Sequence, residues 1–273
     1  MTTTLGDARA IACTDAFATV RPARRRPLHQ SIALAVRRLV HEASATWSYL
    51  RRRPRFPAGA LSYDQYWCAR DPVTVGRRFE LLAALVGERS SVLDVGCGEG
   101  MFLEYVAHTR RARGVGVDIS SAAVERVRLR GIEAEVADVG RGELPAGRFD
   151  HVVCAEMLEH IAEPELVLRA AAARAVKSVL VTLPNTGWYA DRLRLLFGRF
   201  PVQWLHHPAE HLRFFTLADF RDFARDLGFR IRSLHAATGL PVLMDWFPGW
   251  FAQQVVYELE VTTTPPSASD GAQ

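Results

Sequence analysis

The sequence predicts an α/β protein built on a doubly wound sheet of seven strands, mostly parallel with an antiparallel last strand, plus an N-terminal helical extension. Short apolar runs alternate with amphipathic segments between residues 91 and 184, which is typical of parallel strands joined by helices. The run Val92–Val95 ends in Gly96-Cys-Gly-Glu-Gly100, whose glycines allow a sharp turn and a close approach to a ligand. We therefore expect a ligand pocket where this strand meets the N-terminus of the next helix.

Length and composition are those of a chain that buries a substantial core, with 273 residues of which 49% are hydrophobic. No apolar run approaches the roughly 20 residues that a membrane-spanning helix needs, and the N-terminus lacks the pattern of a signal peptide. The four cysteines have no CxxC spacing, which suits a reducing compartment. We expect a cytoplasmic protein and leave peripheral contact with a membrane open.

Positive charge is concentrated near the N-terminus. Residues 21–55 contain ten arginines and one acid, so this segment carries +9 and the rest of a chain of net charge +4 carries −5. A mildly acidic body argues against nucleic acid as a partner of the whole protein.

The chain divides into a basic extension over residues 1–60, a main domain over 61–261 and a disordered tail over 262–273. Within the extension, apolar residues recur every three or four positions from Leu28 to Leu50, which predicts an amphipathic helix. One interpretation is a helix packed on its own domain or on a protein partner. The other is contact with an anionic membrane through residues 21–56.

The main domain begins with an aromatic segment, in which Tyr63, Tyr66, Trp67 and Arg70 share one face of a predicted helix. These side chains either close over a ligand or provide ordinary packing. The remaining elements up to the fifth strand follow in regular alternation. They are helix Arg77–Val86, strand Val92–Val95, the helical segment 102–107, strand Gly114–Asp118, helix Ala122–Leu129, strand Ile132–Asp138, strand Phe149–Ala155, helix Pro164–Ala175 and strand Ser178–Pro184.

The regular pattern stops between Trp188 and Phe215, where we expect an irregular loop that sets specificity for a substrate. Helix Leu217–Leu227 follows. Phe229–His235 and Trp250–Val261 are predicted to be the last two strands, with the second of them antiparallel to the rest.

The second and third predicted strands each end in an acid. Asp118 comes 24 positions after Asp94, a spacing at which a carboxylate accepts hydrogen bonds from the two hydroxyls of a ribose. The alternative role of Asp118 is to cap the helix that begins near Ser120. Asp138 is placed to accept a hydrogen bond from an adenine amino group.

Five motifs in order resemble those of class I S-adenosylmethionine-dependent methyltransferases, which have a Rossmann-like sheet. They are Val92–Gly100, Val117-Asp118, Ala137-Asp138, Phe149-Asp150 and Leu183–Asn185. Met101 stands where the loop of a nicotinamide-binding protein needs its third glycine. The resemblance extends from about Tyr63 to Val261 and implies S-adenosylmethionine as the cofactor.

Two branches of that superfamily are represented. Glu156-Met-Leu-Glu-His160 is similar to ubiquinone-type O-methyltransferases, and several later motifs resemble the MetW-like branch: Thr182–Trp188, Arg192–Pro201, His211, residues 216–228 and Phe247–Ala252. We expect methyl transfer to an oxygen of a small acceptor, such as a sugar, a lipid-linked molecule or a secondary metabolite. The MetW-like branch implies an alternative, a cofactor-binding subunit that regulates a partner acyltransferase.

The resemblance also implies which residues bind the cofactor. They are Asp94, Gly96, Cys97, Gly98, Gly100, Asp118, Ile119, Asp138, Val139 and Glu156.

Glu156, Glu159 and His160 are spaced i, i+3 and i+4, so on a helical turn all three reach one face. With His211 they make either a site for a divalent metal or a metal-free catalytic group, in which a histidine acts as the base. Structural roles are the third alternative. We expect Glu159, His160 and His211 to be catalytic, and we do not favour a metal.

Overall fold

The computed structural model describes residues 37, 40, 43–54, 61–69, 75–203 and 207–261. The predictions for the tail 262–273, for the first arginine cluster and for Arg70 lie outside these residues. The described residues from 40 onward belong to one compact unit. No helix in the described part of the chain is long and apolar enough to cross a bilayer.

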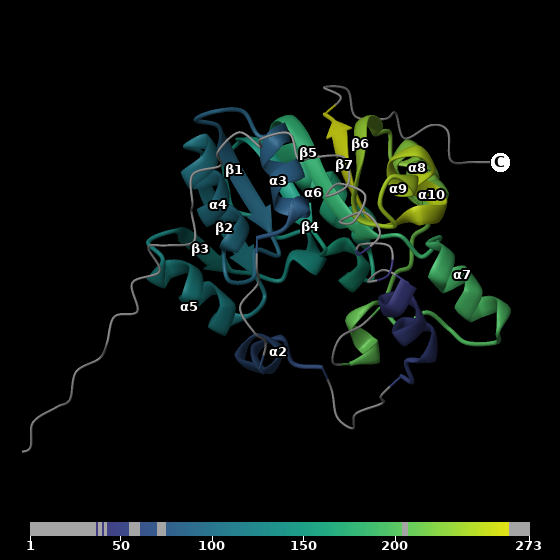
Figure 1. The fold of residues 1–273 in the computed structure, drawn as a ribbon. Coiled ribbons are helices and arrows are strands. Elements are labelled where there is room, and N and C mark those ends of the chain that lie inside the picture. The colour runs from purple at the N-terminus through teal and green to yellow at the C-terminus, as the bar shows by residue number, and fades with distance from the viewer. Residues whose placement is uncertain are drawn as a thin grey trace, which may run out of the picture. The chain divides into compact units, whose positions relative to one another are not determined.

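A seven-stranded sheet forms the centre of this unit, with the order β3-β2-β1-β4-β5-β7-β6 (Figure 1). Neighbouring strands are parallel except that β7 runs antiparallel to both β5 and β6, so the predicted fold class is confirmed. The strands are β1 Ser91–Val95, β2 Arg113–Asp118, β3 Glu133–Val136, β4 Phe149–Ala155, β5 Ala175–Pro184, β6 Arg230–Gly239 and β7 Ala252–Glu260.

Helices cover both faces of the sheet. On one face lie α3 Arg77–Leu85, α4 Met101–Arg110 and α5 Ser121–Leu129, and on the other lie α6 Pro164–Arg174 and α8 Leu217–Asp226. Side chains alternate between the two layers along each strand: Val92 packs with the first group, whereas Leu93 and Val95 pack with the second. This alternation explains why the buried parallel strands read as continuous apolar runs.

The strand order reverses between β1 and β4. Crossover helices leave these two strands toward opposite faces, and a crevice therefore remains beyond their carboxyl ends. The glycine loop that follows β1 and the segment that follows β4 both open into this crevice, although about sixty residues separate them in the sequence.

The prediction of an irregular loop over residues 188–215 is wrong for its first part, which forms helix α7 Tyr189–Leu196. In this helix, polar residues are buried and apolar residues are exposed, the reverse of the usual amphipathic pattern. The residues that it buries are Ala190, Asp191 and Arg194, whereas Leu195 and Leu196 are exposed. A search for an apolar stripe therefore misses it, because polar side chains face inward.

Smaller differences concern element ends. The strand predicted from Trp250 begins at Ala252, because two short helices, α9 Leu243–Trp246 and α10 Pro248–Phe251, precede it. Strand β3 ends at Val136, so Asp138 caps the short 3-10 helix Val139–Arg141 rather than ending the strand.

Arg194 joins α7 to the described end of the N-terminal extension. Arg194 is 1% exposed, and its guanidinium donates to the backbone carbonyls of Tyr49, Leu50 and Arg52, at 2.8, 3.1 and 3.0 Å, and to that of Phe200 at 3.0 Å. Residues 43–51 are helical, and carbonyls at a helix C-terminus lack partners within the helix. The buried cation therefore fixes this helix end on the main domain.

Asp94 is a carboxyl group inside the sheet, at 2% exposure, and its Oδ1 has no hydrogen-bond partner among the described residues. Burial, followed by the nearby Asp118, raises the pKa of Asp94 from 3.8 to about 7. Between these values the folded carboxyl holds a proton that the unfolded chain has lost. Its contribution to stability is therefore intact below pH 3.8 and is lost as the pH rises through 7.

We expect Arg194→Met to lower the free energy of unfolding by about 3 kcal/mol, because four backbone carbonyls lose a hydrogen bond from a buried cation. Urea unfolding measures this change. Arg225→Met is the control, since Arg225 is exposed and pairs with Asp222 and Asp226 at the surface. Equal effects of the two substitutions would contradict the role of Arg194.

We compare the free energy of unfolding of Asp94→Asn with that of the wild type at pH 5 and at pH 8. We expect this difference to shift in favour of the variant by about 2 to 3 kcal/mol from pH 5 to pH 8, because the amide does not ionise. Urea unfolding at the two pH values gives the difference. In the control Asp150→Asn the difference stays constant, because Lys177 and Ser91 lower the pKa of Asp150 to about 2. A constant difference for Asp94→Asn would refute the raised pKa.

Candidate active site

The glycine loop after β1 has a backbone that only glycine adopts without strain. Gly96, Gly98 and Gly100 have φ values of 76°, 51° and 75°. A Cβ on Gly96 would lie 2.6 Å from Cγ of Met157, and one on Gly98 would lie 2.3 Å from Cη2 of Trp67. The loop thus holds its backbone directly against neighbouring side chains.

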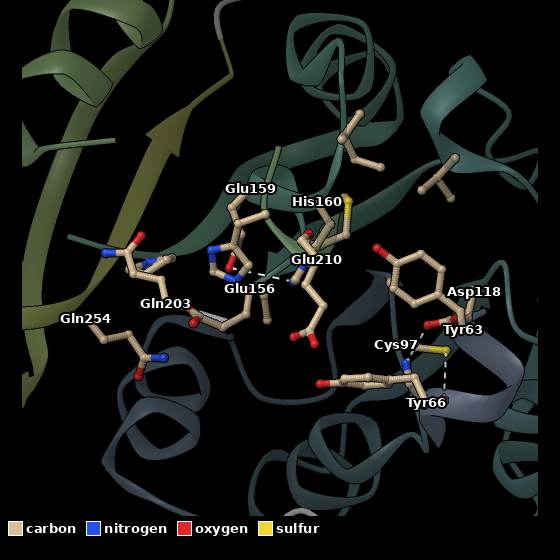
Figure 2. A pocket seen from close by; sticks show the side chains of 18 of the residues that line it. Tyr63, Tyr66, Cys97, Asp118, Glu156, Glu159, His160, Gln203, Glu210 and Gln254 are labelled. Carbon is tan, nitrogen blue, oxygen red and sulfur yellow. Dashed lines mark hydrogen bonds and ion pairs between the residues drawn. The ribbon is translucent and has the colours of Figure 1, made fainter. Parts of the chain in front are cut away.

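A cavity of about 820 Å³ opens over this loop at the crevice between β1 and β4 (Figure 2). Nine of the ten predicted cofactor residues line it, and so do Glu159, His160 and His211. Gly100 is not among the lining residues and instead precedes the first turn of α4. The structure therefore brings the predicted cofactor residues and the predicted catalytic residues together in one cavity.

Asp118 ends β2 and faces the glycine loop. Its carboxylate accepts hydrogen bonds from the backbone N–H groups of Gly98 and Ser120, each at 2.9 Å. The cap of α5 is Ser120, whose hydroxyl accepts from Ala123 N at 3.2 Å, so the predicted alternative role of Asp118 does not apply. Each carboxylate oxygen of Asp118 keeps a lone pair for a ligand.

The neighbouring edge of the cavity combines apolar and acidic groups. Val139 is buried and Ile119 is half exposed, while Asp138 accepts from Gly140 N at 3.1 Å and lies 3.2 Å from Nε of Arg141. Such an edge suits a flat heteroaromatic ring with a polar amino group.

Helix α2 Tyr63–Ala69 lies on the glycine-loop side of the cavity, and Tyr63, Tyr66 and Trp67 line it. The structure therefore favours the ligand-covering interpretation of this aromatic face. Asp64 holds the helix in place by accepting from Ser120 Oγ at 2.6 Å and Ala122 N at 3.2 Å.

Glu156 follows β4 with a left-handed backbone, at φ 52°. Its carboxylate accepts from Thr182 Oγ1 at 3.0 Å and lies 3.9 Å from Arg78. The prediction that Glu156 shares one helical face with Glu159 and His160 is wrong. Helical rotation begins only in the short 3-10 helix Leu158–His160, so the spacing rule does not include Glu156.

Glu159, His160 and His211 form a compact cluster, whose potential ligand atoms all lie within 4.8 Å of one another. The rings of His160 and His211 meet edge to face, with centroids 4.8 Å apart. His160 Nδ1 is hydrogen-bonded to the backbone carbonyl of Glu210, which fixes the ring with Nε2 as its basic nitrogen.

Burial sets the protonation of the other two members of this cluster. Burial, with Glu156 as the second cause, raises the pKa of Glu159 well above its usual value. Burial, followed by His160, lowers the pKa of His211 to about 4, so His211 is neutral at pH 7. Glu159 Oε2 and His211 Nδ1 have no hydrogen-bond partner among the described residues. These two atoms of the cluster are therefore available for a hydrogen bond with a ligand.

Sequence reasoning missed several residues that line the cavity, namely Arg78, Tyr49, Asp191, Gln203 and Gln254. Arg78 extends from α3 to Glu156 and opposes the rise in the pKa of Asp94. Its only sequence signal is a basic side chain just ahead of the glycine-loop strand. The others come from α7, from the segment that follows it, from β7 and from the helical residues 43–51, and only the tertiary fold brings them together.

Comparison with known families and curated relatives gives consistent results. The family model described as Methionine biosynthesis protein MetW matches residues 77–259. The chain is 45% identical over 102 residues to the Ubiquinone biosynthesis O-methyltransferase of Hahella chejuensis, covering 35% of this chain and 41% of the relative. It is 32% identical over 172 residues to that of Pseudomonas paraeruginosa, covering 59% and 72%. Of several such relatives the chain spans less than half the length, from 41% to 46%.

Solved structures show the same fold. A methyltransferase in complex with the Haloferax volcanii Trm112 methyltransferase activator matches with a TM-score of 0.50 and 16% identity, covering 87% of this chain and 99% of the other. The TehB-like SAM-dependent methyltransferase of Corynebacterium glutamicum matches with a TM-score of 0.50 and 14% identity, covering 73% and 96%. Since the family model matches more than half of the chain, including nearly all of the sheet, the chain belongs to the MetW family; its fold is that of class I S-adenosylmethionine-dependent methyltransferases.

Proposed function

We propose that the protein is an S-adenosylmethionine-dependent methyltransferase that acts on an oxygen of a small-molecule acceptor. One observation carries this proposal. The glycine loop with Asp118 and the cluster of Glu159, His160 and His211 line a single cavity at the reversal point of the sheet. A cofactor site and a base thus face the same space.

The residues present fit the cofactor. Asp118 has lone pairs left for the ribose hydroxyls, and the edge formed by Ile119, Asp138 and Val139 suits adenine. At the methionyl end, Glu156 offers a carboxylate for the ammonium group and Arg78 a guanidinium for the carboxylate. The bound cofactor supplies an electrophilic methyl group on a sulfonium.

His160 is the residue that we assign as general base. Its Nδ1–H donates to the Glu210 carbonyl, so Nε2 receives the proton of the acceptor hydroxyl. Glu159 Oε1 lies 4.0 Å from Nε2, close enough for each of the two groups to influence the protonation of the other. His211 stays neutral beside them and orients the acceptor.

A divalent metal on the same cluster is the alternative for this site. We propose the metal-free assignment, because Glu156, the fourth candidate metal ligand in the sequence, contacts Thr182 and Arg78 instead of joining the cluster. Methyl transfer that is lost after chelation, and restored by added magnesium or zinc, would favour the metal.

Contact of residues 21–56 with an anionic membrane or a protein partner stays a prediction, because most of that segment lies outside the described residues. Within the described part, Val40 and Trp47 are exposed and Arg51 stacks on Trp47, with 5.1 Å from Cζ to the ring centroid. An exposed apolar and basic surface of this kind supports a peripheral contact.

We expect Gly98→Ala to weaken binding of S-adenosylmethionine at least tenfold, because the new Cβ displaces the loop and Trp67. Isothermal titration calorimetry measures the affinity. Gly131→Ala is a matched control, since Gly131 also has a positive φ, of 76°, but a Cβ placed there would meet no atom within 4 Å, and the residue lies outside the cavity. Equal losses in the two variants would argue against the assigned cofactor site.

We expect His160→Gln to reduce kcat about 100-fold or more while the affinity for S-adenosylmethionine changes less than twofold, because the variant loses only the base. Transfer of a labelled methyl group to a panel of hydroxylated acceptors measures the rate. His108→Gln, at an exposed position on α4, is the control. Tight cofactor binding without transfer to any acceptor, together with co-purification of an acyltransferase, would favour the regulatory-subunit alternative.

A further inference from the structure

The cavity has a third side, which neither the cofactor loop nor the histidine cluster occupies. In Figure 2, Gln203 and Gln254 lie across the central group of Glu156 and Glu159 from Asp118. Tyr49, Trp188 and Asp191 line the cavity as well. We call these five residues, Tyr49, Trp188, Asp191, Gln203 and Gln254, the third side.

The N-terminal part of the third side is held in place by a buried network. Arg194 fixes the carbonyls of residues 49, 50 and 52, as described above, and its Cζ lies 5.2 Å from the centroid of the Tyr49 ring. The Tyr49 hydroxyl donates to Asp191 Oδ1 and accepts from Val202 N at 3.1 Å. Tyr49 is therefore a rigid part of the cavity, although it precedes the main domain in the sequence.

Asp191 links this network to the amide side chains. Its Oδ2 accepts from Gln203 Nε2 at 3.0 Å, and Gln203 Oε1 accepts from Thr186 Oγ1 at 3.3 Å. Burial raises the pKa of Asp191 to about 6, with Tyr49 and Gln203 opposing that rise through their hydrogen bonds. Asp191 and Gln203 thus hold each other in fixed orientations.

Two polar groups of the third side have no partner among the described residues. Trp188 is 6% exposed, and its Nε1–H, a donor only, makes no hydrogen bond. The Gln254 side chain at the start of β7 makes none either. Buried indole N–H groups are usually paired, so this one is an unsatisfied donor on a residue that lines the cavity.

We propose that the third side binds the non-reacting part of the methyl acceptor, and that this part is a polyhydroxylated ring, as in a glycoside or a cyclitol. The proposal rests on the function proposed above and specifies its substrate class. It also makes Tyr49, which precedes the main domain, part of the acceptor site.

The chemistry of these side chains selects that class. Hydroxyl oxygens accept from Trp188 Nε1, and hydroxyls both donate to and accept from the amide of Gln254. Tyr49 and Trp188, whose rings are 5.4 Å apart and tilted by 47°, both line the cavity, and aromatic rings suit the C–H groups of a saturated ring. A purely apolar acceptor would leave the Trp188 N–H unpaired, and an anionic one would face Asp191.

The test measures binding to the full-length protein saturated with S-adenosylhomocysteine, by saturation-transfer difference NMR. The probes are methyl glycosides of glucose, galactose and rhamnose, myo-inositol, and catechol as the flat aromatic comparison. We expect at least one of the four hydroxylated probes to bind, and Trp188→Phe to weaken that binding at least fivefold with unchanged affinity for S-adenosylhomocysteine. Trp47→Phe, at an exposed tryptophan outside the cavity, is the matched control and leaves binding unchanged.

If Trp188→Phe does not fold, Gln254→Leu provides the same comparison. The proposal would be overturned if none of the three glycosides and myo-inositol bound, or if catechol alone bound. Equal affinity of the wild type and the folded variants for a probe would also overturn it. A probe that binds through Trp188 or Gln254 but is not methylated when S-adenosylmethionine is supplied would support the third side as a binding site. That result would count against the proposed function alone.

Discussion

Parallel pairing of β1 with β4 is the constraint on which the rest of the structure depends. It aligns Val92, Leu93 and Asp94 with residues 151–153, so both strands end at the same edge of the sheet. The glycine loop and the Glu156 segment are thereby brought to one place. Because successive helices leave toward opposite faces there, no helix fills the space between the strand ends, and the cavity is a product of the topology.

The parts of this arrangement that a sequence predicts are those with a local physical signal. Continuous apolar runs identified the buried strands, and the loop of Gly96, Gly98 and Gly100 was identifiable because positive φ angles and close contacts exclude other residues. The spacing from Asp94 to Asp118 likewise predicted that Asp118 lines the cavity. Each of these features depends on neighbours in the sequence.

The parts that escaped prediction depend on tertiary contacts. Helix α7 turns Asp191 and Arg194 inward because its partners are the carbonyls and hydroxyl of residues 49–52, which no local pattern encodes. The left-handed backbone of Glu156 broke the helical spacing that joined it to Glu159. Four of the five buried side-chain atoms without partners among the described residues, in Asp94, Glu159, Trp188 and His211, also line the cavity, and only coordinates reveal that coincidence.

The connection between Tyr49 and Asp191 spans 142 residues, which has a consequence for how the chain folds. Closing so long a loop is entropically costly and therefore slow, whereas the glycine loop and Asp118 pair within twenty residues of each other. We expect the nucleotide half of the cavity to form early and the half that contains residues 43–52 to form last. If unfolding follows the reverse order, the half that contains residues 43–52 opens first in the native state. The free energy of that local opening is then lower than the free energy of global unfolding.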